Sequence, residues 1–365
     1  MATNNAKISS NASSTGVVDW HGVPAVDHSH EVCEVRKEVP GALAWLADDL
    51  KPEMWQVHLS DVAVDEIITV AEHIKENPMQ QLQREEQTLP WPTVRTHVKQ
   101  LRKMLDDGPG FAVLLGLPVD RIDEPGGDTP LENALVEIYW LLGQNIAPTV
   151  AQKWNGEMIY SVCDTGTAYG YGVRGSKTSV ELVFHVDNAF GRAVPDYVGL
   201  LCKQPAKEGG LSRFCSLYTV HDRLLTKDPD ALARLYQPML FDRQAEHDAK
   251  TPKVLLAPFF SWRDDHLFAR ANTSLVRKGY EVAGIEMDQP LLHALDAVDD
   301  ICTDQGLWYE APLARGHIQY LNNHEIGHYR SEFIDHEDPA KKRHLYRLWH
   351  RNNGPRNYDG VAATA

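Results

Sequence analysis

Two side chains with metal-binding chemistry, His185 and Asp187, stand two positions apart in this sequence. Apolar residues occupy every second position from 180 to 187, and this alternation predicts a strand with one face on the core. Side chains two positions apart on a strand point the same way, about 7 Å from each other, so both can reach one metal ion. An imidazole and a carboxylate are two-thirds of the 2-His-1-carboxylate site that holds non-haem Fe(II) and leaves coordination positions open. Because the chain has 17 His, such a pair also arises by chance, and a third ligand is needed.

A candidate third ligand lies in residues 316–330. We expect a strand there up to Leu321, and Asn322-Asn323 is typical of a turn. His324 and His328 follow that turn. Either could be an ordinary core or surface histidine, so the residues by themselves leave the choice open.

Motifs from four places in the chain are specific in combination. They are Phe184-His-Val-Asp-Asn-Ala-Phe190, Gly209-Gly-Leu-Ser212, the stretch 316–330 and Arg343-His-Leu-Tyr-Arg347. With these motifs the chain resembles the taurine dioxygenase and clavaminate synthase-like (TauD/TfdA-like) family of Fe(II)/2-oxoglutarate oxygenases, over roughly residues 40–352. The resemblance implies a mainly β fold with flanking α-helices, a distorted double-stranded β-helix or jelly roll.

The same resemblance implies a role for each candidate ligand. His185, Asp187 and His328 would form the catalytic triad that holds Fe(II). In this family the distal ligand lies a few residues after an Asn-Asn or Asp-Asn turn and is followed by x-Arg, a pattern that His328 and Arg330 match. His324 occupies a position that the family usually fills with another polar residue, so it is the fallback ligand.

A site for the cosubstrate is implied as well. Arg343 lies 15 residues after His328, close to where the family places the arginine that grips the far carboxylate of 2-oxoglutarate, and its planar fork suits a carboxylate. Ser212 matches a family hydroxyl on the same carboxylate. Arg347 matches a second arginine that often holds an anionic group of the substrate. The alternatives are a solvated basic edge for both arginines and ordinary turn chemistry for Ser212.

The reaction implied is oxidation of an unactivated C–H bond, with 2-oxoglutarate and O₂ as cosubstrates and succinate and CO₂ as products. Halogenating relatives lack the carboxylate ligand, so Asp187 predicts hydroxylation, or the same chemistry giving desaturation or another oxidative rearrangement. Clavaminate-like amino-acid hydroxylases use Glu at this position, and Asp187 therefore leaves the branch open. The acidic net charge and Arg347 favour a small polar substrate, anionic or amino-acid-like.

Functions from two other classes compete with this interpretation. A zinc-dependent hydrolase also uses His and Asp ligands, but it needs a general base beside the metal, and no HExxH motif occurs. A non-catalytic β-sandwich binding module would leave the spacing of Arg343 unexplained.

Composition narrows the partners and the compartment. The net charge of −15 opposes binding to nucleic acid or anionic membranes. The five Cys are odd in number and scattered, which favours reduced thiols over a disulfide framework. No apolar run has the length of a signal-peptide core or a membrane span. We therefore expect a cytoplasmic protein that acts on a small molecule, and a homo-oligomer is compatible with the sequence.

The elements that must position these residues follow from hydrophobic periodicity. Helices are expected at 60–73, 93–105, 221–237 and 289–300, and one opened by Thr129-Pro130; strands are expected at 111–119, 158–163, 180–187, 197–202, 213–218, 254–261, 317–322 and 343–350. We expect a flexible N-terminal tail (1–30), one oxygenase domain (31–353) and a C-terminal tail (354–365). The loop 163–178 is either a lid over the site or a plain surface loop.

Overall fold

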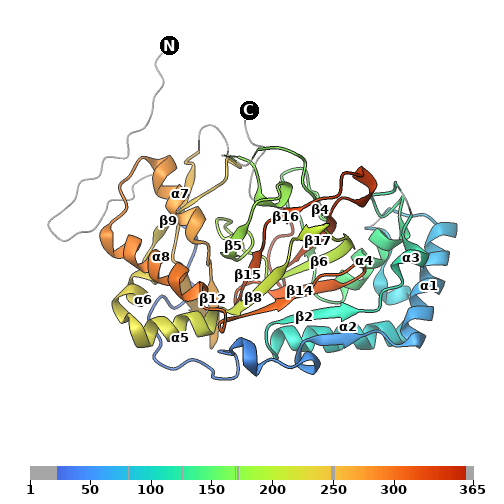
Figure 1. Ribbon diagram of the computed structural model, residues 1–365, viewed down its shortest axis with the longest axis horizontal. Coiled ribbons are helices and arrows are strands. Elements are labelled where there is room, and N and C mark those ends of the chain that lie inside the picture. Colours follow the sequence, from blue (N-terminus) through green and yellow to red (C-terminus); the bar gives the residue numbers. More distant parts are fainter. Residues whose placement is uncertain are drawn as a thin grey trace, which may run out of the picture.

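Strands occupy the middle of the molecule, and helices lie at both ends (Figure 1). The structure is a computed structural model and describes residues 23–80, 82–124, 126–168, 170, 172–247 and 251–358. The α-helices of these ranges are α1 (Asp61–Glu76), α2 (Pro92–Asp106), α3 (Val119–Ile122), α4 (Ala134–Gln144), α5 (Leu217–Lys227), α6 (Pro229–Leu235), α7 (Thr273–Ala283) and α8 (Gln289–Cys302). The helices expected at 60–73, 93–105 and 289–300 are confirmed. Ser60 caps α1 as its type predicts, because its hydroxyl accepts a hydrogen bond from the Ala63 N–H.

The larger sheet carries one wall of the site. Its strands lie in the order β1 (Gln56–His58), β2 (Phe111–Leu115), β14 (Ile318–Asn322), β6 (Tyr197–Gln204), β17 (His344–His350) and β3 (Thr149–Val150), and β4 (Tyr160–Val162) also pairs with β17. β1 and β2 are parallel, and the other pairs are antiparallel. β17 is buried from Leu345 to His350, so it sends side chains into the interior on both faces.

The smaller sheet carries the opposite wall. Its antiparallel strands lie in the order β13 (Trp308–Ala311), β8 (Ser212–Ser216), β15 (Ile326–Arg330) and β5 (Leu182–His185). The register pairs His328 with His185 on one side and Arg330 with Ser212 on the other. Further antiparallel pairs are β9 (Met239–Asp242) with β10 (Val254–Ala257), β11 (Phe260–Arg263) with β12 (His266–Ala269), and β7 (Glu208–Gly209) with β16 (Phe333–Ile334).

An aromatic contact joins the two sheets. Phe111 of β2 stacks on Phe214 of β8 with ring centroids 4.5 Å apart, and both side chains are fully buried. Trp349 of β17 belongs to the same buried apolar cluster. Burying one Phe contributes about 1.5–3 kcal/mol, so this cluster holds the sheets face to face.

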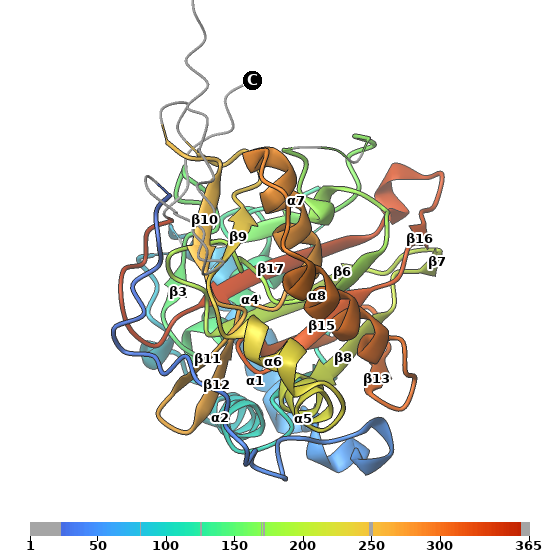
Figure 2. The same cartoon turned by 90° about the vertical axis from the view of Figure 1, so that its left-hand side faces the viewer.

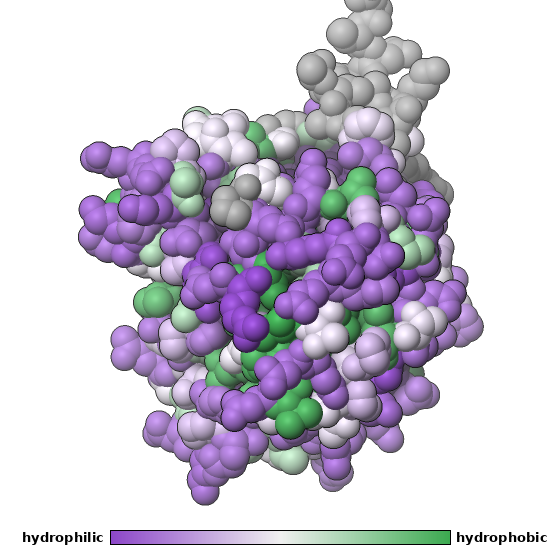
Figure 3. Space-filling model, turned by 90° about the vertical axis from the view of Figure 1, so that its right-hand side faces the viewer, coloured by the Kyte–Doolittle hydropathy of each residue, from purple (hydrophilic) through white to green (hydrophobic). Residues whose placement is uncertain are grey.

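Helices cover both ends of this sheet pair. α5–α8 pack together with β9–β12 around a buried cluster that contains Leu232, Leu235, Val276, Leu291 and Leu295, and Figure 2 shows α7 and α8 in front at this end. α1, α2 and α4 pack on the far end through a second cluster. The surface of that end is mostly hydrophilic around a central strip of apolar surface (Figure 3).

Several expected boundaries were wrong because turn and cap residues overrode periodicity. The helix expected at 221–237 is two helices, since Asp228 accepts from the Ala231 N–H and Pro229 starts α6. The helix expected to open at Thr129-Pro130 begins at Ala134, where Asn133 caps the Leu135 N–H. β8 also ends at Ser216, where α5 begins.

The strand predicted for 180–187 is shorter than expected. β5 ends at His185, so Asp187 lies in the turn that follows. Val186 of the expected apolar row is buried, whereas Leu182 and Phe184 are half-buried. The direction of the Asp187 side chain is therefore set by a turn and its contacts, not by the strand pleat.

The packed chain extends past both domain limits that the sequence suggested. Val26 is buried, and its N–H donates to Leu256 O at 3.0 Å, within the expected N-terminal tail. The carbonyl of Arg356 accepts from the Ala151 N–H at 2.8 Å, within the expected C-terminal tail. The remaining tail positions, 1–22 and 359–365, lie outside the described residues. None of the described helices has both the length and the apolar character of a membrane span.

Candidate metal centre

His185, Asp187 and His328 converge on one point between the two sheets. The Asp187 Oδ1 atom lies 3.7 Å from His185 Nε2 and 3.6 Å from His328 Nε2. One ligand atom from each residue lies within 4.8 Å of the other two. Two imidazoles and one carboxylate are the donors of the non-haem Fe(II) facial triad, so the chemistry of the set fits this metal.

The protonation of His185 suits a metal ligand. Its Nδ1–H donates to the Val183 carbonyl at 2.7 Å, which leaves the Nε2 lone pair facing Asp187 and His328. Burial and the neighbouring His328 lower the pKa of His185 to about 3. The ring is therefore neutral near pH 7, as metal coordination requires.

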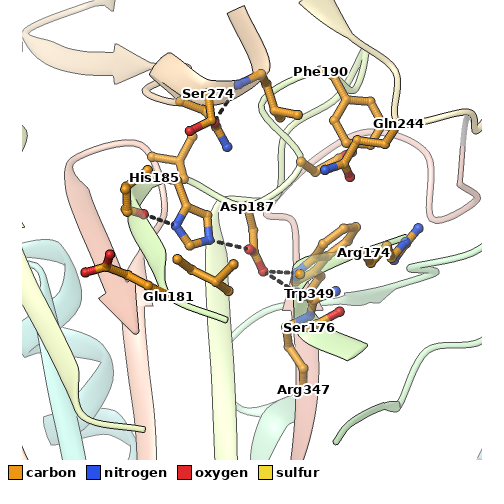
Figure 4. Close-up of a pocket in the computed structure, with 17 residues that line it drawn as sticks. Arg174, Ser176, Glu181, His185, Asp187, Phe190, Gln244, Ser274, Arg347 and Trp349 are labelled. Carbon is orange, nitrogen blue, oxygen red and sulfur yellow. Dashed lines mark hydrogen bonds and ion pairs between the residues drawn. The ribbon is translucent and has the colours of Figure 1, made fainter. Parts of the chain in front are cut away.

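Asp187 is held by donors from the opposite sheet. Its Oδ2 atom accepts from Arg347 Nη1 at 2.9 Å and from Trp349 Nε1 at 2.8 Å, both on β17 (Figure 4). Burial by itself would raise the pKa of Asp187, but the Arg347 guanidinium and the two histidines lower it well below its ordinary value. The Asn323 side chain accepts from the Asp187 N–H and donates to the Asp187 carbonyl. The predicted turn residue Asn323 thus fixes the backbone that aims the carboxylate.

The fallback ligand His324 lies elsewhere. Its Nε2 atom is 2.9 Å from Asp196 Oδ1, and its ring stacks on Phe268 with centroids 3.8 Å apart. The structure groups His328, and not His324, with His185 and Asp187.

A cavity beside the three ligands is rich in arginine. We call it the arginine cavity; its lining includes Arg330, Arg343, Arg347, Ser212, Leu200 and Gln319, together with His185, Asp187 and His328. Arg343 is only 4% exposed, and its Nη1 atom is buried without a hydrogen-bond partner among the described residues. Burial lowers the pKa of Arg343. A buried guanidinium with a free N–H is a built site for an anion.

The Gly209-Gly210 pair makes room for Arg343. Both glycines have positive φ, 75° and 66°. A Cβ on Gly210 would lie 3.0 Å from Arg343 Nε, and one on Gly209 would lie 2.2 Å from the Glu332 carbonyl oxygen. The two glycines therefore set the position of Arg343 as well as the turn that leads to Ser212.

A second cavity, of about 300 Å³, adjoins His185 and Asp187. We call it the amide cavity, because its polar lining includes Asn188, Gln244 and Asn272, with Ser176, Ser274 and Arg174 (Figure 4). Arg347 and Ser176 line both cavities. Arg174 is neutralised by Glu246, with Nη2 2.7 Å from Oε2. A polar molecule in this cavity would lie directly against the metal ligands.

Comparison with known proteins identifies the family of this chain. The family model "Taurine catabolism dioxygenase TauD, TfdA family" matches residues 75–349. The chain belongs to this family. The sequence resemblance to Fe(II)- and 2-oxoglutarate-dependent oxygenases is thereby confirmed, and this TauD/TfdA member is an oxidoreductase of that class, which uses Fe(II), 2-oxoglutarate and O₂.

Individual relatives match nearly the whole chain. FR-33289 synthase of Streptomyces rubellomurinus is 26% identical over 330 residues, which cover 86% of this chain and 91% of that protein. A solved structure of asparagine oxygenase with Fe(II), 2S,3S-3-hydroxyasparagine and succinate has a TM-score of 0.62 at 19% identity and covers 82% of this chain and 94% of that one. The oxygenase OrfP with Fe, succinate and (3S)-hydroxy-L-Arg has a TM-score of 0.61 at 13% identity over 82% of this chain and 94% of its own. Both structures share this fold.

Sequence analysis missed two contributors to the site of this TauD/TfdA protein. Trp349, which donates to Asp187, lies two positions after Arg347 on β17, so the period of two could have revealed it. Arg330 was noted as part of a motif, but its place in the arginine cavity was not expected. It lies two positions after His328 on β15, so the same period of two could have placed it beside that ligand.

Proposed function

We propose that His185, Asp187 and His328 hold one Fe(II) ion, and that Arg343 and Ser212 bind the far carboxylate of 2-oxoglutarate. One observation carries the proposal: the three ligands line the same cavity as a buried guanidinium with an unpartnered N–H. A facial triad leaves adjacent positions free for a chelating keto acid. Within each of the two sheets, most neighbouring strands are antiparallel. This supports the further proposal that the larger and smaller sheets form a distorted double-stranded β-helix.

We propose a small polar, amino-acid-like substrate in the amide cavity, which loses hydrogen from an unactivated C–H bond and is hydroxylated. The cavity's amide and hydroxyl groups support it. So do the amino-acid products named in the asparagine oxygenase and OrfP structures. The net charge of the lining is small, since Arg174 pairs with Glu246 and Arg347 with Asp187. A zwitterion fits such a lining better than a strongly charged anion does.

The contacts of each site residue indicate its role in the reaction. When bound, Fe(II) with 2-oxoglutarate and O₂ supplies the oxidising power that unactivated C–H bonds require. Val183 and Asn323 orient His185 and Asp187, and Arg347 keeps Asp187 ionised. Arg343 and Ser212 orient the cosubstrate. The substrate role that the sequence suggested for Arg347 stays a proposal, because its Nε and Nη1 atoms are already bonded to Gln152 and Asp187.

Anaerobic addition of Fe(II) and 2-oxoglutarate tests the proposal. The chelated keto acid should give a visible charge-transfer band, and Asp187→Ala and His185→Ala should each lose it. If the doubly substituted protein kept the band, the ligand assignment would be wrong. Absence of the band in the wild type would contradict the proposed Fe(II) and 2-oxoglutarate sites.

A panel of amino acids, with succinate release as the readout, tests the substrate class. An amino acid that is a substrate should increase the rate of succinate release, and the amount of succinate should match the amount of amino acid oxidised. Mass spectrometry of the product then separates hydroxylation, which adds oxygen, from desaturation, which removes two hydrogens. If no amino acid or small zwitterion stimulates succinate release while the charge-transfer band is present, the substrate class is wrong and the cofactor assignment stands.

A further inference from the structure

Arg330 links the arginine cavity to the wall of the amide cavity. It lies at the end of β15, is 7% exposed, and lines the arginine cavity with Arg343. In the register of the smaller sheet it pairs with Ser212, the proposed partner of the far carboxylate of 2-oxoglutarate. Its guanidinium is therefore close to where that carboxylate would bind.

Among the described residues, the side-chain hydrogen bonds of Arg330 all go to one short segment of the chain. The Nη2 atom donates to Thr178 O at 2.9 Å and to Val180 O, and Nη1 donates to Gly175 O at 3.4 Å. We call residues 172–182 the wall segment, because Arg174, Gly175, Ser176, Glu181 and Leu182 line the amide cavity. The buried Arg330 side chain thus ties three carbonyls of the wall segment to β15, in addition to the hydrogen bond from the Tyr329 hydroxyl to Glu181.

Part of the Arg330 guanidinium group lacks a hydrogen-bond partner. Its Nε atom, like Nη1 of Arg343, is buried without a hydrogen-bond partner among the described residues. Each guanidinium carbon lies 5.0 Å from the centroid of the Phe333 ring. Within the described ranges, neither arginine forms an ion pair with a carboxylate. Asp164 and Asp335 act on them only from a distance, so the two buried like charges repel each other and destabilise the surrounding structure.

A bound cosubstrate would act on this pair of guanidinium groups, because both line the arginine cavity. The far carboxylate of 2-oxoglutarate, bound next to the pair, would bring one negative charge and so reduce the repulsion between the two guanidinium groups. This binding would also stabilise the wall segment, because the Arg330 side chain donates hydrogen bonds to carbonyls of that segment.

We propose that Arg330 is a positioning residue that couples binding of the far carboxylate of 2-oxoglutarate to ordering of the wall segment. The cosubstrate then helps to shape the pocket for the primary substrate without touching it. This inference rests on the proposed function, since it takes the arginine cavity to be the 2-oxoglutarate site. It assigns to Arg330 a part distinct from that of Arg343, which grips the carboxylate itself.

Hydrogen–deuterium exchange of the Fe(II)-loaded protein under anaerobic conditions tests the coupling in the wild type. Saturating 2-oxoglutarate should slow amide exchange in residues 172–182 by about tenfold. Saturating 2-oxobutyrate, which chelates iron but has no far carboxylate, should slow it by less than about twofold. Equal slowing by both keto acids would overturn the proposal, because ordering would then follow iron chelation alone.

Variants separate positioning from binding. Arg330→Lys keeps the charge but cannot bridge three carbonyls, so the charge-transfer band should persist while the 2-oxoglutarate-dependent slowing is lost. Arg95→Lys is the matched control. Arg95 also donates to loop carbonyls, those of Glu86 and Leu89, but it lines neither cavity. Its variant should show the full slowing in residues 172–182.

The experiments distinguish a failure of the Arg330 coupling from a failure of the proposed function. If Arg330→Lys retains the wild-type slowing by 2-oxoglutarate, Arg330 does not couple the two cavities. If it abolishes the band, Arg330 is a direct ligand of the cosubstrate and the positioning role is wrong. If the wild type gives no band with 2-oxoglutarate, the proposed function itself fails.

Discussion

His185 on β5 and His328 on β15 are register partners across the smaller sheet, and their ring centroids lie 4.2 Å apart. Strand pairing alone therefore brings together two imidazoles that are far apart in the chain. The carboxylate of Asp187 completes the group from the turn after β5.

Replacing His328 by Ala should abolish Fe(II) binding, measured by equilibrium dialysis with anaerobic protein. Loss of a ligand should exceed the roughly 10–100-fold loss of affinity that is usual for changes beyond the ligands. The control is His324→Gln, which can still bond to Asp196. It should retain one Fe(II) per chain. Iron loss in His324→Gln at unchanged thermal stability would restore His324 as the ligand.

Fe(II) binding through Asp187 should depend more on Arg347 than on Trp349. Trp349→Phe removes one neutral donor and should weaken Fe(II) binding by about tenfold. Arg347→Met removes a donor and a charge, so burial can raise the pKa of Asp187, and the loss should approach about 100-fold. If Arg347 also holds the substrate, the substrate Kd of iron-saturated Arg347→Met should rise. An unchanged Kd would leave Arg347 as a support of Asp187 alone.

The Gly210→Ala variant should bind 2-oxoglutarate less well, because its Cβ would crowd Arg343. Gly284→Ala is the matched control: its φ of 67° equals that of Gly210 within a degree, and no atom lies within 4 Å of the added Cβ. Both substitutions should lower the free energy of unfolding by about 1–2 kcal/mol. Titration of the charge-transfer band should show about tenfold weaker 2-oxoglutarate binding in Gly210→Ala only. Equal affinities in the two variants would contradict the packing argument.

Asp242 of β9 should destabilise the protein at neutral pH. Burial raises the pKa of Asp242 to about 6, above the unfolded value of about 3.9. The folded state thus binds this proton more tightly, and stability falls as pH rises from about 4 to 6. Asp242→Asn should therefore raise the free energy of unfolding by about 2 kcal/mol at pH 7.5 and have little effect below about pH 4. Urea denaturation at several pH values measures this difference.

Asp128 provides a control of opposite sign for that experiment. Despite some burial, hydrogen bonds from Tyr346 and Lys203 lower the pKa of Asp128. Its charge therefore stabilises the fold above the unfolded pKa, and Asp128→Asn should reduce stability at pH 7.5. A stabilising Asp128→Asn, or a destabilising Asp242→Asn, would show that the sign of these effects is wrong.

Local patterns in the chain predicted a good part of the elements. The apolar spacing in α1 and α2 is set within a few turns, and Ser60 marks its own helix start, so neither depends on distant residues. The break at Asp228-Pro229 and the start at Asn133 were missed, although both carry cap chemistry in the sequence. The first error came from giving periodicity more weight than capping, and the second came from taking Thr129-Pro130 as the cap in place of Asn133.

The amino-acid sequence by itself determined which side chains are available for chemistry: His185 close to Asp187, two histidines after an Asn-Asn turn, and two arginines four positions apart. Only the tertiary structure decided between His324 and His328, paired Arg347 with Asp187, and turned Arg330 toward the wall segment. The physical reason is that side-chain type and alternation are local properties of the chain. The register between β5, β15 and β17 depends on how both sheets pack over the whole core.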